Sequence, residues 1–497
     1  MKLSRILIIL LFVCTVMSWV LFAVVGERGL VDLISLCLMS LVNATLIFSL
    51  ATATSRTAPI VIIWAVVMSV YFSTRFIALI LDPEQILLGN RFFFGVEDMN
   101  RALLYILPAM ILTAVGFALG GKLAPSRIPS RPNLDTHSSS LMKRTALIGI
   151  ASVILGYAGM LFFDVANFSS NELEAAAPWW YSMASIFLNQ DAVCMIAIVI
   201  TGEHWRKSSK VGKRRMRVFF GMYVFELLLC GTRAVFARPL FWILQYLLAK
   251  KGDIKFSSLR ALKWFVAILI AIVFIFPIAT SLKIAWNSGE LIEEQVTFME
   301  YAITRGPGFG FSDLLSQVSF HKAGLDTLII IVNQTGPEVS EYLSPKRQIK
   351  YLVNKLIPGW DPFPEATLQT SRLFAPAYRG WSLEFVKRVY NSDLWTLWGL
   401  SYAQFGLIGS FIMIFLISFL LSWGYQWVGR AKSSLHIVWR VLMLSFITSM
   451  LLSQGFETSI WLYSHQWLSV AFMLALMLRS SRTQCVKRLR PLVWESH

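Results

Sequence analysis

Cationic side chains stand at unusual places in this chain, inside or beside long apolar runs. Arg75 lies within one such run, and Arg233 comes two residues after Gly231 between two apolar segments. Because an arginine in a membrane is costly, it commonly faces a polar cavity or an anion, and its planar guanidinium suits phosphate oxygens. A lipid diphosphate is the anion expected at that depth; for Arg75, a side chain reaching toward lipid headgroups is the alternative. The residues from which we expect a cationic binding site are Arg75, Arg233, Arg305, Lys322, Arg372 and Arg379.

Three further side chains are candidates for moving a proton. His321 can act as a general base on a hydroxyl group, because neutral imidazole titrates near physiological pH; a histidine on a helix surface is the alternative. Glu457 and His465 are eight residues apart, about two helical turns, so they could share one face. An acid inside a membrane span is a functional candidate by default, and a structural bridge to an arginine is the alternative. We therefore predict His321, Glu457 and His465 as catalytic candidates.

Motifs of soluble enzymes are absent from the sequence. There is no phosphate-binding P-loop, no dinucleotide fingerprint after a strand, no H-E-x-x-H and no C-x-x-C. The histidines outside the basic segments, His321 and His465, are too far apart in sequence to indicate a metal site by spacing. We predict neither a metal nor another cofactor. Tryptophans such as Trp398 could stack on sugar rings or form an interfacial belt.

The elements that must position these residues are membrane helices. The chain has 497 residues, of which 56% are hydrophobic and 15% charged, and its mean hydropathy is +0.62. This composition is typical of polytopic membrane proteins and not of soluble domains. The apolar run from Ile6 to Val25 is longer than the core of a signal peptide, so we expect it to be a retained first helix. The sequence predicts an all-α polytopic membrane protein.

Apolar segments of suitable length predict about twelve spans. They are 6–25, 31–53, 59–81, 102–121, 145–163, 182–201, 218–232, 234–249, 264–285, 394–424, 438–454 and 460–478. With both termini in the cytoplasm, every dense basic cluster falls on the cytoplasmic side, as the positive-inside rule requires. The net charge of +17 therefore reflects membrane topology, and no nucleic-acid partner is expected. The span at 218–232 is too short to cross the membrane upright.

The long interval between the ninth and tenth spans divides the chain. We expect four parts: spans one to nine in 1–286, a non-cytoplasmic loop with short amphipathic helices in 287–393, spans ten to twelve in 394–478, and a basic cytoplasmic tail in 479–497.

Four stretches resemble the bacterial O-antigen polymerases (Wzy-type), in the order in which that family carries them. They are Gly231–Ala234, His321–Leu328, Leu356–Trp360 and Leu397–Gly409. The layout of many spans with one large periplasmic loop extends the resemblance to nearly the whole chain.

The resemblance implies a metal-independent glycosyltransferase of the bacterial inner membrane. Its donor and acceptor would be undecaprenyl-diphosphate-linked oligosaccharide repeat units, joined at the periplasmic face into O-antigen or a related surface polysaccharide. The lipid bilayer and a polysaccharide chain-length regulator would be its partners. Arg233 matches the family's hairpin arginine, a diphosphate contact, whereas His321 and Lys322 stand where the family usually has arginine.

Two other functions fit the same layout. An O-antigen ligase would transfer the polymer to a lipid A core, and a lipid-linked oligosaccharide flippase or another transporter would use many spans and buried charges without forming a bond.

Overall fold

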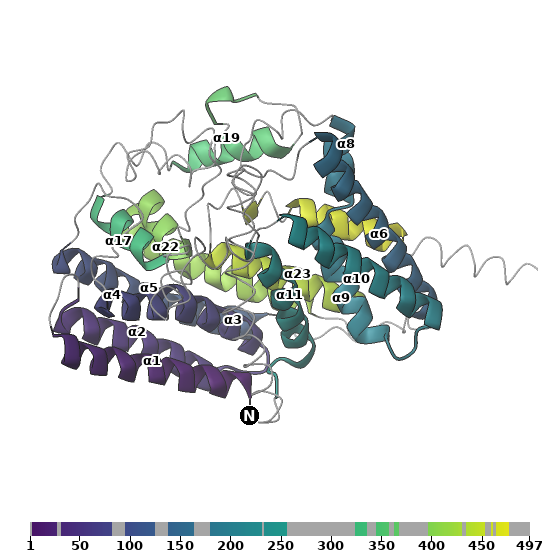
Figure 1. Ribbon diagram of the computed structural model, residues 1–497. Helices are drawn as coiled ribbons and strands as arrows, with labels where there is room; N and C mark the ends of the chain where they lie inside the picture. The colour runs from purple at the N-terminus through teal and green to yellow at the C-terminus, as the bar shows by residue number, and fades with distance from the viewer. Residues whose placement is uncertain are drawn as a thin grey trace, which may run out of the picture.

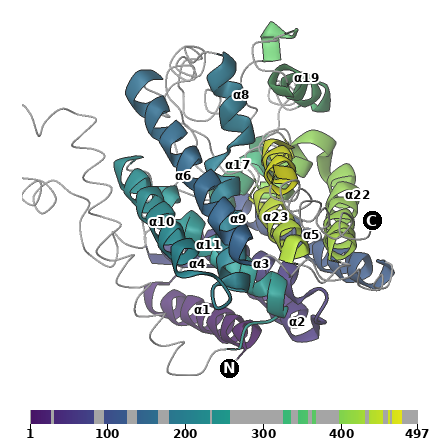
Figure 2. The ribbon, with the colours of Figure 1, turned by 90° about the vertical axis from the view of Figure 1, so that its right-hand side faces the viewer.

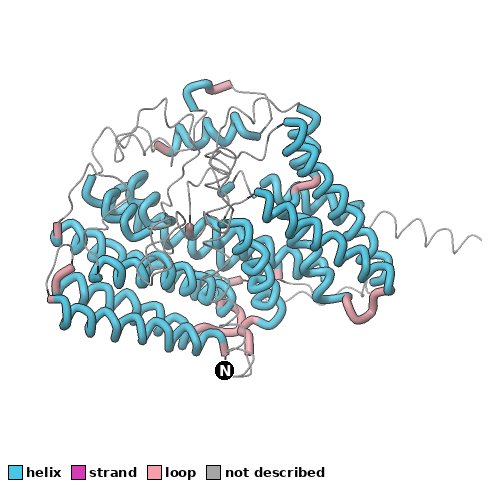
Figure 3. Tube along the Cα trace, viewed as in Figure 1, coloured by secondary structure: helices cyan, strands magenta, loops and turns pink. Residues whose placement is uncertain are grey.

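The structure is a computed structural model, and almost all of the residues it describes are helical (Figure 3). The described residues are 2–26, 31–81, 95–124, 138–163, 179–230, 233–255, 324–334, 344–356, 362–366, 396–429, 434–452, 459–460 and 464–476. No strand occurs among them, and Lys2 and Lys255 form an isolated antiparallel bridge. The predicted all-α fold is confirmed for this part of the chain.

The helices of the described residues are labelled in chain order in Figure 1. Their bounds are α1 Leu3–Val25, α2 Leu33–Thr52, α3 Ala58–Met68, the π-helix η1 Ser69–Ser73, α4 Thr74–Leu81, α5 Val96–Leu123, α6 Ser138–Phe163, α8 Trp179–Phe187, α9 Gln190–His204, α10 Lys210–Cys230, α11 Arg233–Lys251, α17 Gly324–Gln334, α19 Pro345–Leu356, the 3-10 turn η4 Pro364–Ala366, α22 Thr396–Val428 and α23 Ser434–Leu451.

Seven helical stretches in the described part of the chain are long and apolar enough to cross a membrane. They are Leu3–Val25, Leu33–Thr52, Ala58–Leu81, Val96–Leu123, Ser140–Ala158, Ala184–His204 and Thr396–Val428. Helices α10, α11 and α23 cover three further predicted spans, whereas the predicted span 264–285 lies outside the described residues. The chain is thus a helical membrane protein by length and composition of its helices, and the number of about twelve spans stays a prediction.

Local sequence signals explain where several helices begin. Asp32 caps α2, since its side chain accepts a hydrogen bond from the backbone N–H of Ser35 and the Ser35 hydroxyl accepts one from the backbone N–H of Asp32. Asn189 accepts one from Ala192 and starts α9, which separates α9 from α8 inside the predicted span 182–201. Helix α10 is longer than the predicted 218–232 span because it begins in the basic segment at Lys210, where Lys and Arg are good helix formers.

Helices α5 and α22 make the most extensive contact between described helices, and they meet through small residues. A Cβ atom on Gly116 would lie 2.8 Å from Cβ of Ser418, and one on Gly120 would overlap the carbonyl oxygen of Phe419. The hydroxyl of Ser422 donates a 2.8 Å hydrogen bond to the carbonyl of Phe117 across this interface. Small residues permit such close approach in membranes, where dispersion and interhelical hydrogen bonds drive association.

A second group of helices consists of α6, α9 and α10, which lie side by side in both views (Figures 1 and 2). Helix α19 lies at the top in both views, at the far side from the N-terminus. Helix α23 connects the two groups, since it packs against α22 and α9.

Segments distant in sequence meet at one end of the helix array. The backbone N–H of Leu3 donates to the carbonyl of Ile254 at 2.8 Å, and Ser4 binds Asp253 through a 2.7 Å side-chain hydrogen bond. Near the turn between α2 and α3, the side chain of Gln426 donates to the carbonyl of Arg56 at 2.6 Å. Basic residues lie at the N-terminus, in this turn and at the end of α11, and Arg430 follows α22 in the sequence.

Candidate functional site

Helix α17 is a short apolar helix from within the long interval, and it is buried in the helix array. Every residue from Gly324 to Ile331 is buried, including Asp326 and Thr327 at 1% exposure each. Helices α5 and α22 and the π-helix η1 surround it (Figure 1). At 11 residues α17 is too short to cross a bilayer. Part of the interval predicted as a loop over the membrane helices is therefore packed among them.

Arg75 and Asp326 form the ion pair that joins α17 to α4. Nε of Arg75 lies 2.9 Å and 3.1 Å from the two carboxylate oxygens of Asp326, and Nη2 lies 2.8 Å from Oδ2. Both side chains are 1% exposed. Such a two-oxygen contact with a guanidinium is directional and strong, and a buried arginine requires it because an unpaired charge would be very costly. The pair thus fixes the position of α17 relative to α4.

The helix turn before Arg75 is irregular and polar. Residues 69–73 form the π-helix η1, a form often found at functional sites. The hydroxyl of Ser73 donates to Asn43 at 2.8 Å, and the amide of Asn43 donates to Thr15 at 3.0 Å. This chain of hydrogen bonds connects η1 to α2 and α1, so two helices hold the turn that precedes Arg75.

The first residues of α22 close the other side of α17. A Cβ atom on Gly324 would lie 3.0 Å from Cγ2 of Thr396, and one on Gly399 would lie 3.0 Å from Cδ1 of Ile331. Thr396 itself has a φ of 59°, a backbone conformation that is unusual for a β-branched residue. The two glycines therefore permit a contact that larger residues would prevent.

Trp398 lies in the core beside this contact. It is fully buried, its Nε1–H donates to Thr113 at 3.0 Å, and its ring meets Phe72 edge to face at 5.9 Å. The hydroxyl of Tyr105 donates to its carbonyl at 2.7 Å. Trp398 consequently presents no free ring face to a sugar and is not part of an interfacial belt; both readings of this residue from the sequence are wrong.

The structure describes three of the nine predicted site residues. Arg75 is paired with Asp326, His465 is half-buried in a helical stretch at 464–476, and Arg233 is the first residue of α11, with its side chain outside the described part. The other six lie outside the described residues, and their roles stay predictions: His321, Glu457, Arg305, Lys322, Arg372 and Arg379.

Asp326 belongs to the candidate site, and the sequence did not single it out. An acid inside the apolar stretch 325–332 is as conspicuous as an arginine inside a span, and each is the natural counter-ion of the other. Pairing the two would have required knowing that residues 251 positions apart meet.

The chemistry that the described site permits follows from its charge. Asp326 occupies Nε and Nη2 of Arg75 and balances its charge, so Arg75 is a structural ion pair in the described site. The described part of the chain brings together no group of three His, Cys, Asp or Glu side chains that could hold a metal ion.

Comparisons with protein-family models, with curated proteins and with solved structures gave no match.

Proposed function

We propose that this protein is a glycosyltransferase of the bacterial inner membrane that polymerises undecaprenyl-diphosphate-linked oligosaccharide repeat units, without a metal, at the periplasmic face. The observation that supports the proposal is a contact between two of the stretches that resemble O-antigen polymerases. Gly324–Leu328 in α17 and Leu397–Gly409 in α22 are distant in sequence, and α17 packs against α22. In this proposal helix α17 anchors the interval 287–393 among the membrane helices.

The topology in this proposal has twelve spans, both termini in the cytoplasm and the interval 287–393 in the periplasm. It is supported by the meeting of Leu3 with Ile254 and of Gln426 with Arg56 at one end of the array. Under the positive-inside rule these basic segments all belong on one side. At the other end, Asn333 of α17 donates to the carbonyl of Asp98 at 2.9 Å, where α5 begins.

The proposed reaction joins two lipid-linked chains. An acceptor hydroxyl oxygen forms a new bond to the anomeric carbon of the donor, and the bond from that carbon to the lipid diphosphate breaks, leaving its electron pair on the diphosphate. The hydroxyl proton passes to a base, for which His321, Glu457 and His465 are the candidates. Positive charge stabilises the departing diphosphate.

Arg233 is the residue that we assign to the diphosphate. It begins the 19-residue helix α11, so the unpaired backbone N–H groups of a helix N-terminus lie beside it and favour the same anion. Arg305, Lys322, Arg372 and Arg379 are further candidates for this contact. Arg75 has a different task, because its ion pair with Asp326 holds α17 in place.

Reconstitution tests the proposal. Purified protein in proteoliposomes is supplied with lipid-diphosphate-linked repeat units and no nucleotide sugar, and products are separated on a gel. We expect a ladder of lengthened chains, loss of the ladder in Arg233→Ala, and a normal ladder in the control Arg56→Ala. An unchanged ladder from Arg233→Ala at normal protein levels would contradict the assignment.

The same assay separates the other candidate functions. Movement of the lipid-linked unit across the bilayer without lengthening indicates a flippase or transporter. Transfer to an added lipid A core acceptor, with no lengthening of the repeat units, indicates a ligase.

A further inference from the structure

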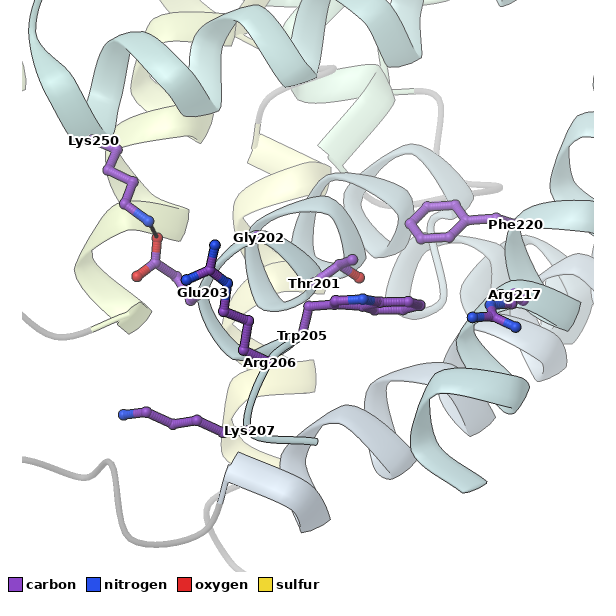
Figure 4. A pocket seen from close by; sticks show the side chains of 9 residues that line it. All are labelled: Thr201, Gly202, Glu203, Trp205, Arg206, Lys207, Arg217, Phe220 and Lys250. Carbon is purple, nitrogen blue, oxygen red and sulfur yellow. Dashed lines mark ion pairs between the residues drawn. The ribbon is translucent and has the colours of Figure 1, made fainter. Parts of the chain in front are cut away.

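A hollow lies at the end of α9, and none of its lining residues belongs to the Arg75–Asp326 pair. Its volume is about 730 Å³, and it lies among the turn after α9, helix α10 and the last turn of α11 (Figure 4). Its lining residues are Thr201, Gly202, Glu203, Trp205, Arg206, Lys207, Arg217, Phe220 and Lys250. We call it the basic cavity.

The charge of the basic cavity is strongly positive. Four cationic side chains and one acidic side chain line it. Glu203 lies 2.7 Å from Nζ of Lys250 and is thereby neutralised. Among the described residues, no carboxylate lies within ion-pair distance of Arg206, Lys207 or Arg217. Three cations thus line one hollow with no acidic partner in the described part of the chain.

Close packing holds the walls of the cavity in place. The hydroxyl of Tyr246 donates to Glu203 at 2.7 Å and accepts a 3.1 Å hydrogen bond from Lys250. A side chain on Gly202 would overlap the Tyr246 ring, so glycine is needed for this approach. The positive-inside rule explains why basic residues occur here, but it does not require them to line a packed cavity.

The indole ring of Trp205 is part of the cavity lining. Nζ of Lys213 lies 5.7 Å and Cζ of Arg217 lies 5.6 Å from the centroid of the Trp205 ring, both within cation–π range. In Figure 4 the Trp205 ring lies between the Lys250–Glu203 pair on one side and Phe220 and Arg217 on the other. Contact with the Trp205 ring therefore holds Lys213 and Arg217 in position before a ligand binds.

The cavity also lies where apolar helix surface begins. Phe220 lines it on α10, and the exposed residues Val224 and Phe225 follow along the same helix. A ligand that fits both features has an anionic phosphate beside an apolar chain. Basic pockets between membrane helices on the cytoplasmic side bind the head groups of anionic lipids by this chemistry.

We propose that the basic cavity binds the phosphodiester head group of an anionic phospholipid from the adjacent leaflet, with Arg206 and Arg217 as the main phosphate contacts. Lys207 adds long-range attraction, and Phe220 directs the acyl chains toward the apolar part of α10. This site is separate from the proposed glycosyltransferase site and does not depend on it.

The test is lipid binding by the full chain in a neutral detergent, followed by isothermal titration. The probes are short-chain phosphatidylglycerol, short-chain phosphatidylcholine and inorganic phosphate. The test variant is Arg206→Gln with Arg217→Gln. The control is Arg214→Gln with Arg215→Gln, which removes the same charge from α10 outside the cavity, since Arg214 and Arg215 line a separate hollow of about 290 Å³.

We expect saturable binding of phosphatidylglycerol that is at least about tenfold weaker in the test variant and within about twofold of wild type in the control. Equal weakening in both variants, or equal binding of phosphatidylcholine, would overturn the proposal. Inorganic phosphate that binds as tightly and displaces the lipid would identify free phosphate as the ligand and would also overturn it.

A second variant, Glu203→Gln, tests the proposal even if the double variant does not fold. Glu203→Gln removes the one acid and no cation, so binding of phosphatidylglycerol should tighten by about two- to threefold at low salt. Unchanged or weaker binding in this variant would contradict the proposal.

Discussion

The two charged regions of this protein differ in what surrounds their arginines. At the junction of α4 and α17, Arg75 is fully buried and paired with Asp326. In the basic cavity, Arg206 and Arg217 are exposed and have no acidic partner among the described residues. A buried charge needs an opposite charge beside it within the protein. A charge at the surface is hydrated by water and remains available to a ligand. The first region therefore holds helices together, and the second is available for binding.

Removing the buried carboxylate of Asp326 should have the largest effect on the free energy of unfolding. Asp326→Ala removes the carboxylate that binds the buried guanidinium of Arg75, and we expect the free energy of unfolding to fall by about 3–5 kcal/mol. Thermal unfolding in detergent, followed by circular dichroism, measures it.

The matched control replaces both partners by apolar residues. Arg75→Met combined with Asp326→Leu removes the pair without leaving a charge, and it should recover most of the lost stability. If the single and double variants were equally unstable, the ion pair would not be the cause.

Helix packing distinguishes the same two parts of the molecule. Gly120 of α5 faces the backbone of α22, so Gly120→Ala should destabilise by about 1–3 kcal/mol through overpacking. Gly221 of α10 has nothing within 4 Å of its added Cβ, so Gly221→Ala should be neutral or stabilise by up to about 1 kcal/mol. Unfolding midpoints of the two variants, measured side by side, compare them; equal losses would contradict the close contact.

The smallest stability effect is expected at the surface pair. Glu203 and Lys250 are 20% and 39% exposed, so Glu203→Gln should change the unfolding free energy by at most about 1 kcal/mol. Because solvent ions screen exposed charges, that difference should vanish in about 1 M salt, whereas the loss in Asp326→Ala should persist. A salt-resistant loss in Glu203→Gln would show that this pair behaves as a buried one.

The charge state of Lys250 is consistent with a cavity that stays cationic. Burial lowers its pKa, but hydrogen bonds with Glu203 and Tyr246 outweigh that effect and raise the pKa above the ordinary value of 10.5. The stabilisation from this shift is fully present below the unfolded pKa and is lost only as the pH rises through the folded one. Lys250 therefore remains charged at physiological pH.

Hydrophobic patterning predicted the elements well and their packing poorly. Apolar run length is a property of the local sequence, so most predicted spans in the described part correspond to helices. Short amphipathic helices were predicted in the loop 287–393, but the burial of α17 against α5 and α22 could not be read from its composition. Basic residues at 210–217 concealed the true length of α10, because polarity ends a span without ending a helix.

The residue types of the candidate site could be predicted from the sequence, but their interaction partners were harder to predict. Arg75 was predicted as a site residue because a charge inside a membrane is energetically costly. The same reasoning, applied to the apolar segment after Gly324, would have identified Asp326. Trp398 was misread because a tryptophan beside a predicted loop gives no sign of whether its N–H has a buried acceptor such as Thr113. The basic cavity was missed because its clusters had been explained by topology, although Trp205 stands among those cations.

The ion pair between Arg75 and Asp326 has a consequence for the order of biosynthesis. Its two residues are separated by 251 positions, so at a synthesis rate of about 5–20 residues per second Arg75 emerges roughly 10–50 seconds before its partner. Throughout that interval α4 carries a guanidinium with no Asp326 beside it, and water, lipid headgroups or the insertion machinery must accommodate the charge. The first helices can reach their final arrangement only after α17 has been made, which ties the folding of the N-terminal third to a late segment of the chain.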